Sequence, residues 1–189
     1  TMLSRDFNAR LLLEEFSENP FLPKFYRDPE KHAFPLELFF MAERYHQLKD
    51  FKTQDLFKPR IFSDYFFVKS KLFAKNNLKK DEMQLFNRLF NIMLSSVSKP
   101  DLLIYLFADV SRLKKNIKKR GREFEQNISD QYLYDIQEKY LDYLRKQTDI
   151  PVLVLDVTSV DFVKDKRVYD LINQYLSCSY SKGYHQKFL

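Results

Sequence analysis

Four short apolar runs along the chain have the length and composition of buried β-strands. They are rich in Leu, Ile, Val and Phe, and turn-forming or polar residues flank them. The runs cover residues 10–13, 60–62, 102–107 and 152–157. The last two are almost continuously apolar, which is typical of central parallel strands buried on both faces, and Pro100 and Pro151 precede them.

Longer segments between these runs place apolar residues at helical spacing. Two sets stand out: Leu36, Phe39, Phe40, Ala42, Tyr45 and Leu48, and then Met83, Phe86, Leu89, Phe90 and Met93. Strands that alternate with helices of this length indicate an α/β fold with a parallel sheet covered on both faces. A chain of 189 residues favours one compact domain, so we predict a single domain over residues 1–189.

Local sequence also predicts where some helices begin and end. Asp109 is suited to cap the helix that follows the run at 102–107, and this helix leads into a polar loop near Arg122. Residues 1–7 resemble the last turns of a helix that leads into the strand at 10–13. We therefore expect the sequence to start inside a structural element.

Composition limits the classes of protein that fit. The charged fraction is 31%, and no apolar run approaches the roughly 18 residues of a membrane span. Arg5, Asp6 and Glu14 interrupt the apolar residues that an export signal would need, so we expect a cytoplasmic protein. One cysteine allows no internal disulfide, and the three histidines lack metal-ligand spacing, so we expect no structural metal.

The glycine content excludes one common phosphate-binding motif. A G-x-x-x-x-G-K-[ST] loop needs two glycines five residues apart, whereas the two glycines of this sequence are Gly121 and Gly183. The printed sequence therefore contains no such loop.

A dense basic segment nevertheless makes a candidate phosphate site. Six of the nine residues from 114 to 122 are positively charged: Lys114, Lys115, Lys118, Lys119, Arg120 and Arg122. Guanidinium groups bind phosphate oxygens in a bidentate fork and offset the charge of a transferring phosphoryl group. From charge alone, a solvated helix end favoured by the helix dipole is the alternative. The net charge of +6 is consistent with a phosphate site and with a solvated basic surface, and also with a polyanionic partner.

The surrounding sequence resembles the deoxynucleoside kinase family, and its bacterial deoxyguanosine and deoxyadenosine kinases in particular. The resemblance rests on the strand at 101–106, on Arg120-Gly121-Arg122-Glu123-Phe124-Glu125-Gln126, and on Tyr132-Leu133 and Tyr140. It implies a three-layer, P-loop kinase-like α/β fold and an arginine-rich lid at about residues 118–130 that closes over ATP phosphates. It further implies that ATP and Mg²⁺ are cofactors, and that the protein is a homodimer through helices such as 36–48 and 83–93.

The same resemblance assigns catalytic and sugar-binding roles. Leu12-Leu13-Glu14-Glu15-Phe16 resembles the family's second strand, which ends in the general base for the nucleoside 5'-hydroxyl. That role falls on Glu14, with Glu15 as the alternative in register. Tyr26 and Glu125 would bind the sugar 3'-hydroxyl, and Arg120 and Arg122 would face the phosphates. For Tyr26, core packing is the alternative.

Base recognition is implied for a third group of residues. Glu37 and Arg44 occupy the family's glutamine and arginine positions two helical turns apart, Asp64 belongs to a Ser-Asp pair, and Phe34 could form a wall for the base. A carboxylate at Glu37 only accepts hydrogen bonds, and the guanine edge offers two adjacent donors. We therefore expect a purine substrate, with deoxyguanosine favoured.

The sequence departs from the family pattern in two places. Before Ser63-Asp64, where the family often carries an arginine that helps to hold the 5' end, this chain has Lys58-Pro59-Arg60, and Arg60 is a possible substitute in another register. The family's phosphate loop and first strand would precede residue 1. We therefore expect the sequence to be part of a longer gene product.

Two other functions compete with this interpretation. A nucleoside monophosphate kinase such as thymidylate kinase would share the architecture and the lid. A non-catalytic, basic binding domain would instead bind a polyanion in a salt-sensitive way. Glu14, Glu37, Asp64 and Glu125 would repel a polyphosphate backbone, so we expect no nucleic-acid partner. The charged fraction and the lack of a long apolar run lead us to expect no membrane partner either.

Overall fold

The computed structural model describes residues 1–14, 19–49 and 60–189. It forms two compact units, Thr1–Ser98 (unit 1) and Lys99–Leu189 (unit 2). Glu15, the alternative base, lies outside the described residues, as do Lys58 and Pro59. The single domain over residues 1–189 stays a prediction, and the two units are described separately.

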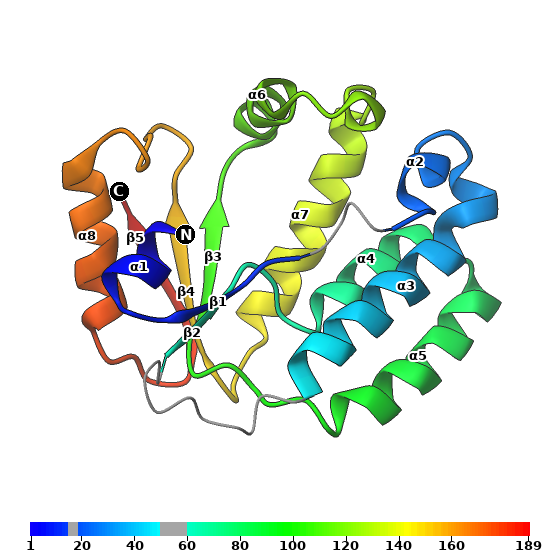
Figure 1. Ribbon diagram of the computed structural model, residues 1–189, viewed down its shortest axis with the longest axis horizontal. Helices are drawn as coiled ribbons and strands as arrows, with labels where there is room; N and C mark the ends of the chain where they lie inside the picture. Colours follow the sequence, from blue (N-terminus) through cyan, green and yellow to red (C-terminus); the bar gives the residue numbers. More distant parts are fainter. Residues whose placement is uncertain (15–18, 50–59) are drawn as a thin grey trace. The chain divides into compact units, whose positions relative to one another are not determined.

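Unit 1 contains two short parallel strands and five helices among its described residues. In chain order they are α1 (Met2–Asp6), β1 (Arg10–Leu12), α2 (Leu22–Phe25), α3 (Pro29–Lys49), β2 (Ile61–Ser63), α4 (Lys69–Asn77) and α5 (Lys80–Leu94) (Figure 1). In the parallel pair, Leu11 lies opposite Phe62. The strands predicted at 10–13 and 60–62 are confirmed, and so is the helix within residues 1–7.

The hydrophobic core of unit 1 lies mainly between helices. Its buried members are Met41, Phe67, Ala74, Phe86 and Phe90, which come from α3, the segment before α4, α4 itself and α5. The rings of Phe67 and Phe90 stack with their centroids 4.9 Å apart. Both helical patterns are therefore confirmed, because their apolar faces bury this aromatic core.

Unit 2 contains a parallel sheet in the order β3-β4-β5. Its elements are β3 (Leu103–Phe107), α6 (Val110–Arg120), the 3₁₀ helix η1 (Glu123–Glu125), α7 (Asp130–Arg145), β4 (Pro151–Asp156), α8 (Lys166–Ser177) and β5 (Gly183–Phe188). The strands predicted at 102–107 and 152–157 are confirmed. The sequence pattern missed β5, whose polar residues His185, Gln186 and Lys187 hide its pairing with β4.

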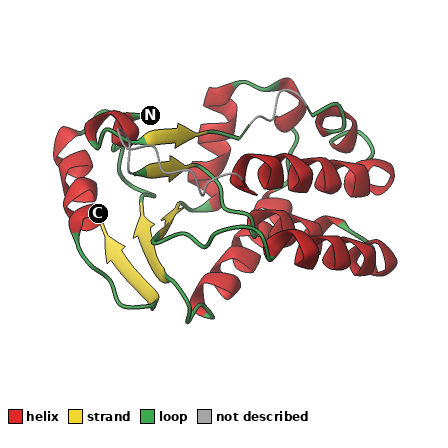
Figure 2. Cartoon of the chain, turned by 60° about the horizontal axis from the view of Figure 1, so that its bottom comes forward, coloured by secondary structure: helices red, strands yellow, loops and turns green. Residues whose placement is uncertain are grey.

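Helices cover both faces of this sheet (Figure 1, Figure 2). On one face, Val152 and Val154 of β4 pack with Leu144 of α7. On the other, Leu153 and Leu155 pack with Ile172 of α8. Alternate residues of one strand thus contact opposite helices, as the period of two along a β-strand requires. The predicted three-layer α/β architecture is confirmed.

One detail of the strand prediction was wrong. We expected β3 to be as deeply buried as β4, but its residues are only partly buried and Leu106 is 44% exposed. Within the described part of unit 2, β4 has a neighbouring strand on each side, whereas β3 pairs with β4 on one side. An apolar run therefore did not distinguish a central strand from one at an edge of this sheet.

Candidate active site

Polar side chains gather in unit 1 where β1 and β2 end. Glu14 lies two residues beyond β1, and Asp64 directly follows β2. The backbone N–H of Asp64 donates to the carbonyl of Leu12 (3.2 Å), and the backbone N–H of Glu14 donates to Oδ1 of Asp64 (2.9 Å). The two carboxyl-bearing residues are therefore held at the carboxyl ends of parallel strands, where α/β proteins commonly bind ligands.

Two cationic side chains bind the carboxylate of Glu14. Arg44 of α3 contacts Oε1 through Nε (2.7 Å) and Nη2 (2.5 Å), and the ammonium of Lys69 lies 2.6 Å from Oε2. The same guanidinium donates from Nη1 to Oγ of Ser70 (2.8 Å). Burial acts to raise the pKa of Glu14, but the charges of Arg44 and Lys69 outweigh it, so the pKa lies below its ordinary value. Glu14 is therefore ionised at neutral pH.

Glu37 has the opposite electrostatic environment. Its side chain on α3 is fully enclosed at 2% exposure, and Oε1 accepts a hydrogen bond from Nδ2 of Asn77 (2.7 Å). Burial raises the pKa of Glu37 to about 7, although the Asn77 hydrogen bond and the charge of Arg44 both act to lower it. This carboxyl is therefore divided between its neutral and ionised forms near neutral pH.

The two aromatic candidates of unit 1 pack against other apolar groups. Tyr26 directly follows α2, and its ring meets that of Phe25 edge to face at 5.4 Å between centroids. Phe34 is partly buried and packs against the core between α3, α4 and α5. Core packing thus accounts for part of the contacts of both side chains.

In unit 2, the predicted lid follows helix α6. Asp109 caps this helix by accepting from the backbone N–H of Arg112 (2.6 Å), as the sequence predicted. The helix ends at Gly121, whose φ of 75° is the left-handed conformation that glycine adopts without strain. Gln126 Nε2 then donates to the carbonyl of Arg122 (3.0 Å), which ties the two ends of η1 together.

The three candidate residues of the predicted lid form one ion cluster. The buried carboxylate of Glu125 accepts from Nη1 of Arg122 at 2.9 Å and also pairs with Nη2 of Arg120. The side chain of Arg120 is 48% exposed, and its guanidinium carries five N–H donors, so it can bind an anion as well as Glu125. The cluster thus fixes the guanidinium groups relative to one another.

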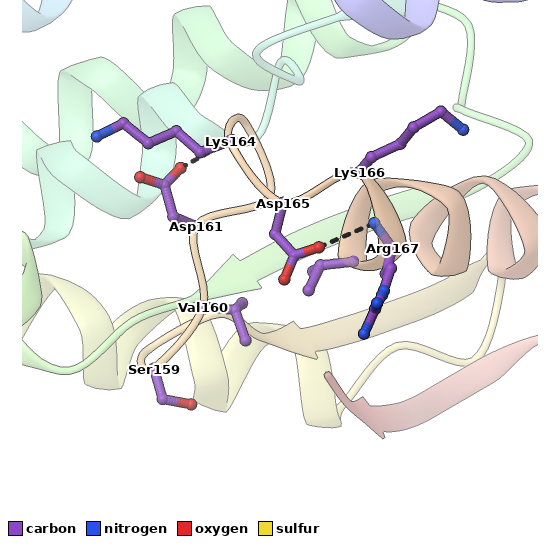
Figure 3. A pocket seen from close by; sticks show the side chains of 8 residues that line it. Ser159, Val160, Asp161, Lys164, Asp165, Lys166 and Arg167 are labelled. Carbon is purple, nitrogen blue, oxygen red and sulfur yellow. Dashed lines mark hydrogen bonds between the residues drawn. The ribbon is translucent and has the colours of Figure 1, made fainter.

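Unit 2 also contains a surface hollow (Figure 3). It is lined by residues of the loop after β4 and the start of α8, namely Ser159, Val160, Asp161, Lys164, Asp165, Lys166, Arg167 and Val168. Asp161 accepts from the backbone N–H of Lys164 (3.3 Å), and Asp165 caps α8 by accepting from that of Arg167 (2.9 Å). These carboxylates therefore stabilise the turn.

Residues 1–14, 19–49 and 60–189 contain neither a cluster of metal-ligating side chains nor a membrane-spanning helix. No group of three His, Cys, Asp or Glu side chains there is arranged to hold a metal ion. No helix in the same ranges is long and apolar enough to cross a membrane.

Comparison with known proteins identifies the family. The family model "Deoxynucleoside kinase" matches residues 1–177. The deoxyguanosine kinase of Bacillus subtilis (strain 168) is 32% identical over 177 residues, covering 91% of this chain and 86% of that protein. The chain belongs to the deoxynucleoside kinase family.

Other relatives agree with this assignment. The deoxyadenosine/deoxycytidine kinase of Bacillus subtilis (strain 168) is 29% identical, covering 93% of this chain and 83% of that protein. The solved structure of a deoxyadenosine kinase from M. mycoides with bound dATP superposes with a TM-score of 0.79 at 26% identity, covering 94% of this chain and 91% of that one. The resemblance seen in the sequence and the P-loop kinase-like fold are confirmed, and the family consists of ATP-dependent phosphotransferases.

Within this deoxynucleoside kinase, the structure brings some predicted residues together and adds others. In unit 1, Glu14, Arg44 and Asp64 form one cluster, and in unit 2, Arg120, Arg122 and Glu125 form another. Sequence analysis missed Lys69 and Asn77, which contact Glu14 and Glu37. Both lie on α4, where neither a motif nor the resemblance pointed to them.

Proposed function

We propose that this deoxynucleoside kinase transfers the γ-phosphoryl group of ATP to the 5'-hydroxyl of a purine deoxynucleoside, with deoxyguanosine favoured. The observation that carries the proposal is the ionised carboxylate of Glu14 at the carboxyl ends of β1 and β2. A carboxylate in this state can accept the proton of a substrate hydroxyl as the hydroxyl oxygen attacks phosphorus.

Each unit supplies residues for this reaction. In unit 1, Glu14 accepts the 5'-hydroxyl proton, and Tyr26 binds the sugar. In unit 2, Arg120 and Arg122 neutralise charge on the phosphates, and Glu125 also binds the sugar. Because most of the barrier to phosphoryl transfer is lowered by positioning and charge, a cluster that fixes two guanidinium groups suits the task.

The residues present fit part of an ATP site. The two lid arginines offer the paired N–H donors that phosphate oxygens accept. Mg²⁺ in kinases is commonly held through the substrate phosphates and one or two carboxylates. When bound, ATP and Mg²⁺ supply the phosphoryl group and offset its charge.

The choice of base is proposed to depend on Glu37, Arg44, Asp64 and Phe34. Ionised Glu37 can accept from the ring N–H and the amino group of guanine together. Arg44 contributes indirectly. Its guanidinium binds Glu14, the proposed general base, and so links that residue to the helix that carries Glu37. The name of the Bacillus subtilis deoxyguanosine kinase supports this preference.

The test is the relative rate with the four deoxynucleosides and with their monophosphates. We expect kcat/KM to be highest for deoxyguanosine, and we expect Glu37→Gln to shift preference toward deoxyadenosine by about tenfold or more, because a carboxamide both donates and accepts. A clear pyrimidine preference would contradict the role of Glu37. Phosphorylation of a monophosphate but not of a nucleoside would indicate a nucleoside monophosphate kinase. Salt-sensitive DNA binding by a protein that has no saturable nucleoside site would indicate a non-catalytic binding domain.

The remaining features of the proposal concern the whole protein. We propose a cytoplasmic homodimer that acts in nucleotide salvage, with no nucleic-acid or membrane partner. Support for the homodimer comes from α5, whose Leu85 and Ile92 are exposed although Phe86 and Phe90 of the same helix are buried.

A further inference from the structure

Lys69, the first residue of α4, forms an ion pair with Glu14 that no sequence pattern indicated. Its Nζ lies 2.6 Å from Oε2 of Glu14, although the two residues are 55 positions apart in the chain. The side chains of Lys69 and Glu14 are 21% and 19% exposed, so the pair is enclosed by protein but still reachable from solvent. A substrate could therefore approach it.

The two cations bound to Glu14 differ in what they leave available. Arg44 directs two nitrogens at Oε1, and a carboxylate offers about four acceptor positions in all. Lys69 takes one position on Oε2. Among the described residues, the atom of Glu14 best placed to accept a further hydrogen bond is therefore Oε2, beside the Lys69 ammonium.

The surroundings of the two cations also differ. The guanidinium of Arg44 is almost fully buried and is fixed by Ser70 as well as Glu14. The ammonium of Lys69 has three N–H donors, of which Glu14 takes one, and it lies 5.9 Å from the centre of the Phe73 ring. Arg44 is thus held by two partners, whereas the Lys69 ammonium has N–H donors beyond the one that Glu14 accepts.

A carboxylate base in a kinase faces an electrostatic conflict. It must accept the proton of the attacking hydroxyl while a phosphoryl group arrives with negative charge spread over three oxygens. An uncompensated carboxylate would repel that group. The Lys69 ammonium, 2.6 Å away, offsets the charge of the Glu14 carboxylate. Arg60, the substitute considered from the sequence, instead lies over the ring of Phe7, 5.2 Å from the ring centroid.

We propose that Lys69 is a positioning residue for phosphoryl transfer, whose ammonium orients Oε2 of Glu14 toward the 5'-hydroxyl and offsets the carboxylate's charge beside the arriving phosphoryl group. The inference rests on the proposed function, because it takes Glu14 as the base. Lys69 acts through Glu14, so its substitution changes how well the base works more than how tightly the nucleoside binds.

The experiment compares Lys69→Met, Lys69→Arg and the control Lys75→Met, an exposed lysine of the same helix, in the protein as its gene encodes it. We expect Lys69→Met to lower kcat for the deoxynucleoside by about 10- to 100-fold with little change in KM. The acid limb of the pH–rate profile should shift to higher pH by about one unit, because only Arg44 then remains to lower the pKa of Glu14. Lys69→Arg should restore both values, and Lys75→Met should match the wild type.

Several outcomes would overturn the inference. A Lys69→Met variant with wild-type kcat and acid limb shows that the ion pair is only structural, even if its melting temperature falls. If Lys69→Met does not fold, Lys69→Arg decides: a kcat within tenfold of wild type supports the role of positive charge, and a larger loss contradicts it. A wild-type protein that phosphorylates no deoxynucleoside contradicts the proposed function itself, which is a separate result.

Discussion

Two carboxyl groups of unit 1 show how residue environment separates chemical roles. Glu14 and Glu37 have the same side chain, but Glu14 lies against two cations and Glu37 lies in a closed site with Asn77 as its hydrogen-bond donor. The pKa of Glu14 is therefore lowered, whereas burial raises that of Glu37 to about 7. Glu14 is thus kept ionised, as the proposed general base must be, and Glu37 can change its hydrogen-bonding character near neutral pH.

Glu37 should make the stability of the protein depend on pH. Because its pKa is raised on folding, the folded state binds more protons than the unfolded state between pH about 4.5 and about 7, so stability falls as pH rises through this window. The slope from this group is at most about 1.4 kcal/mol per pH unit. Glu37→Gln should remove it, which urea unfolding at pH 5, 6, 7 and 8 would measure.

The control for this measurement is the difference between the two proteins at each pH, since all other titrating groups are shared. The wild type should lose stability relative to Glu37→Gln as pH rises from 5 to 7, and the difference should level off above pH 8. If the free energies of unfolding of the two proteins changed in parallel with pH across this range, the Glu37 carboxyl would have an ordinary pKa in the folded protein.

At the scale of elements, helix α6 and the predicted lid show how local signals set the position of charged groups. Asp109 caps the start of α6 and Gly121 ends it, so both termini are encoded within a dozen residues. The break at Gly121 separates Arg120 from Arg122, and both side chains then reach Glu125. Termination of the helix at this residue therefore determines the geometry of the ion cluster.

Gly121→Ala should destabilise unit 2 through the backbone alone. A Cβ at residue 121 would meet nothing within 4 Å, so the cost comes from the positive φ of 75°. We expect a loss of about 1 kcal/mol in the free energy of unfolding, measured by urea denaturation. Lys118→Ala, at an exposed position of the same helix, should change it by less than about 0.5 kcal/mol. Equal stability of Gly121→Ala and the wild type would mean that the helix can end elsewhere.

At the scale of the whole molecule, the exposed apolar residues of α5 bear on the proposed homodimer. Helix α5 buries Phe86 and Phe90 in the core of unit 1, yet Ile92 is 69% exposed and Leu85 lies two turns away on the same side. Large apolar side chains grouped on the outer side of an amphipathic helix are typical of a surface that another protein covers. The proposed homodimer assigns that surface to a second copy.

Ile92→Glu should weaken this homodimer. A charge buried in an apolar interface without a partner is costly, so we expect the dimer dissociation constant to rise at least tenfold, measured by sedimentation velocity over a range of concentrations. Gln84→Glu, at another exposed position of α5, is the matched control and should leave the dimer intact. An Ile92→Glu protein that dimerises as the wild type does would place the interface elsewhere.

Most secondary structure was predictable because it follows local periodicity. Four of the five described strands lie where branched apolar runs occur, and α3 and α5 follow their apolar spacing. The strand β5 was missed because its residues are mostly polar and only its partner β4 makes it a strand. The partial exposure of β3 could not be predicted either, since it depends on which strands lie beside it.

Residue order alone was enough to identify the family and to locate Glu14, Glu37 and the Arg-Gly-Arg segment of the predicted lid, because these features depend on local sequence and conformation. Which groups these residues contact follows from the folding of distant segments onto one another. Lys69 and Asn77 reach Glu14 and Glu37 from 55 and 40 residues away, and Arg44 reaches Glu14 from 30. Burial and nearby charge set the pKa of a carboxyl group, and both come from segments that only folding brings together.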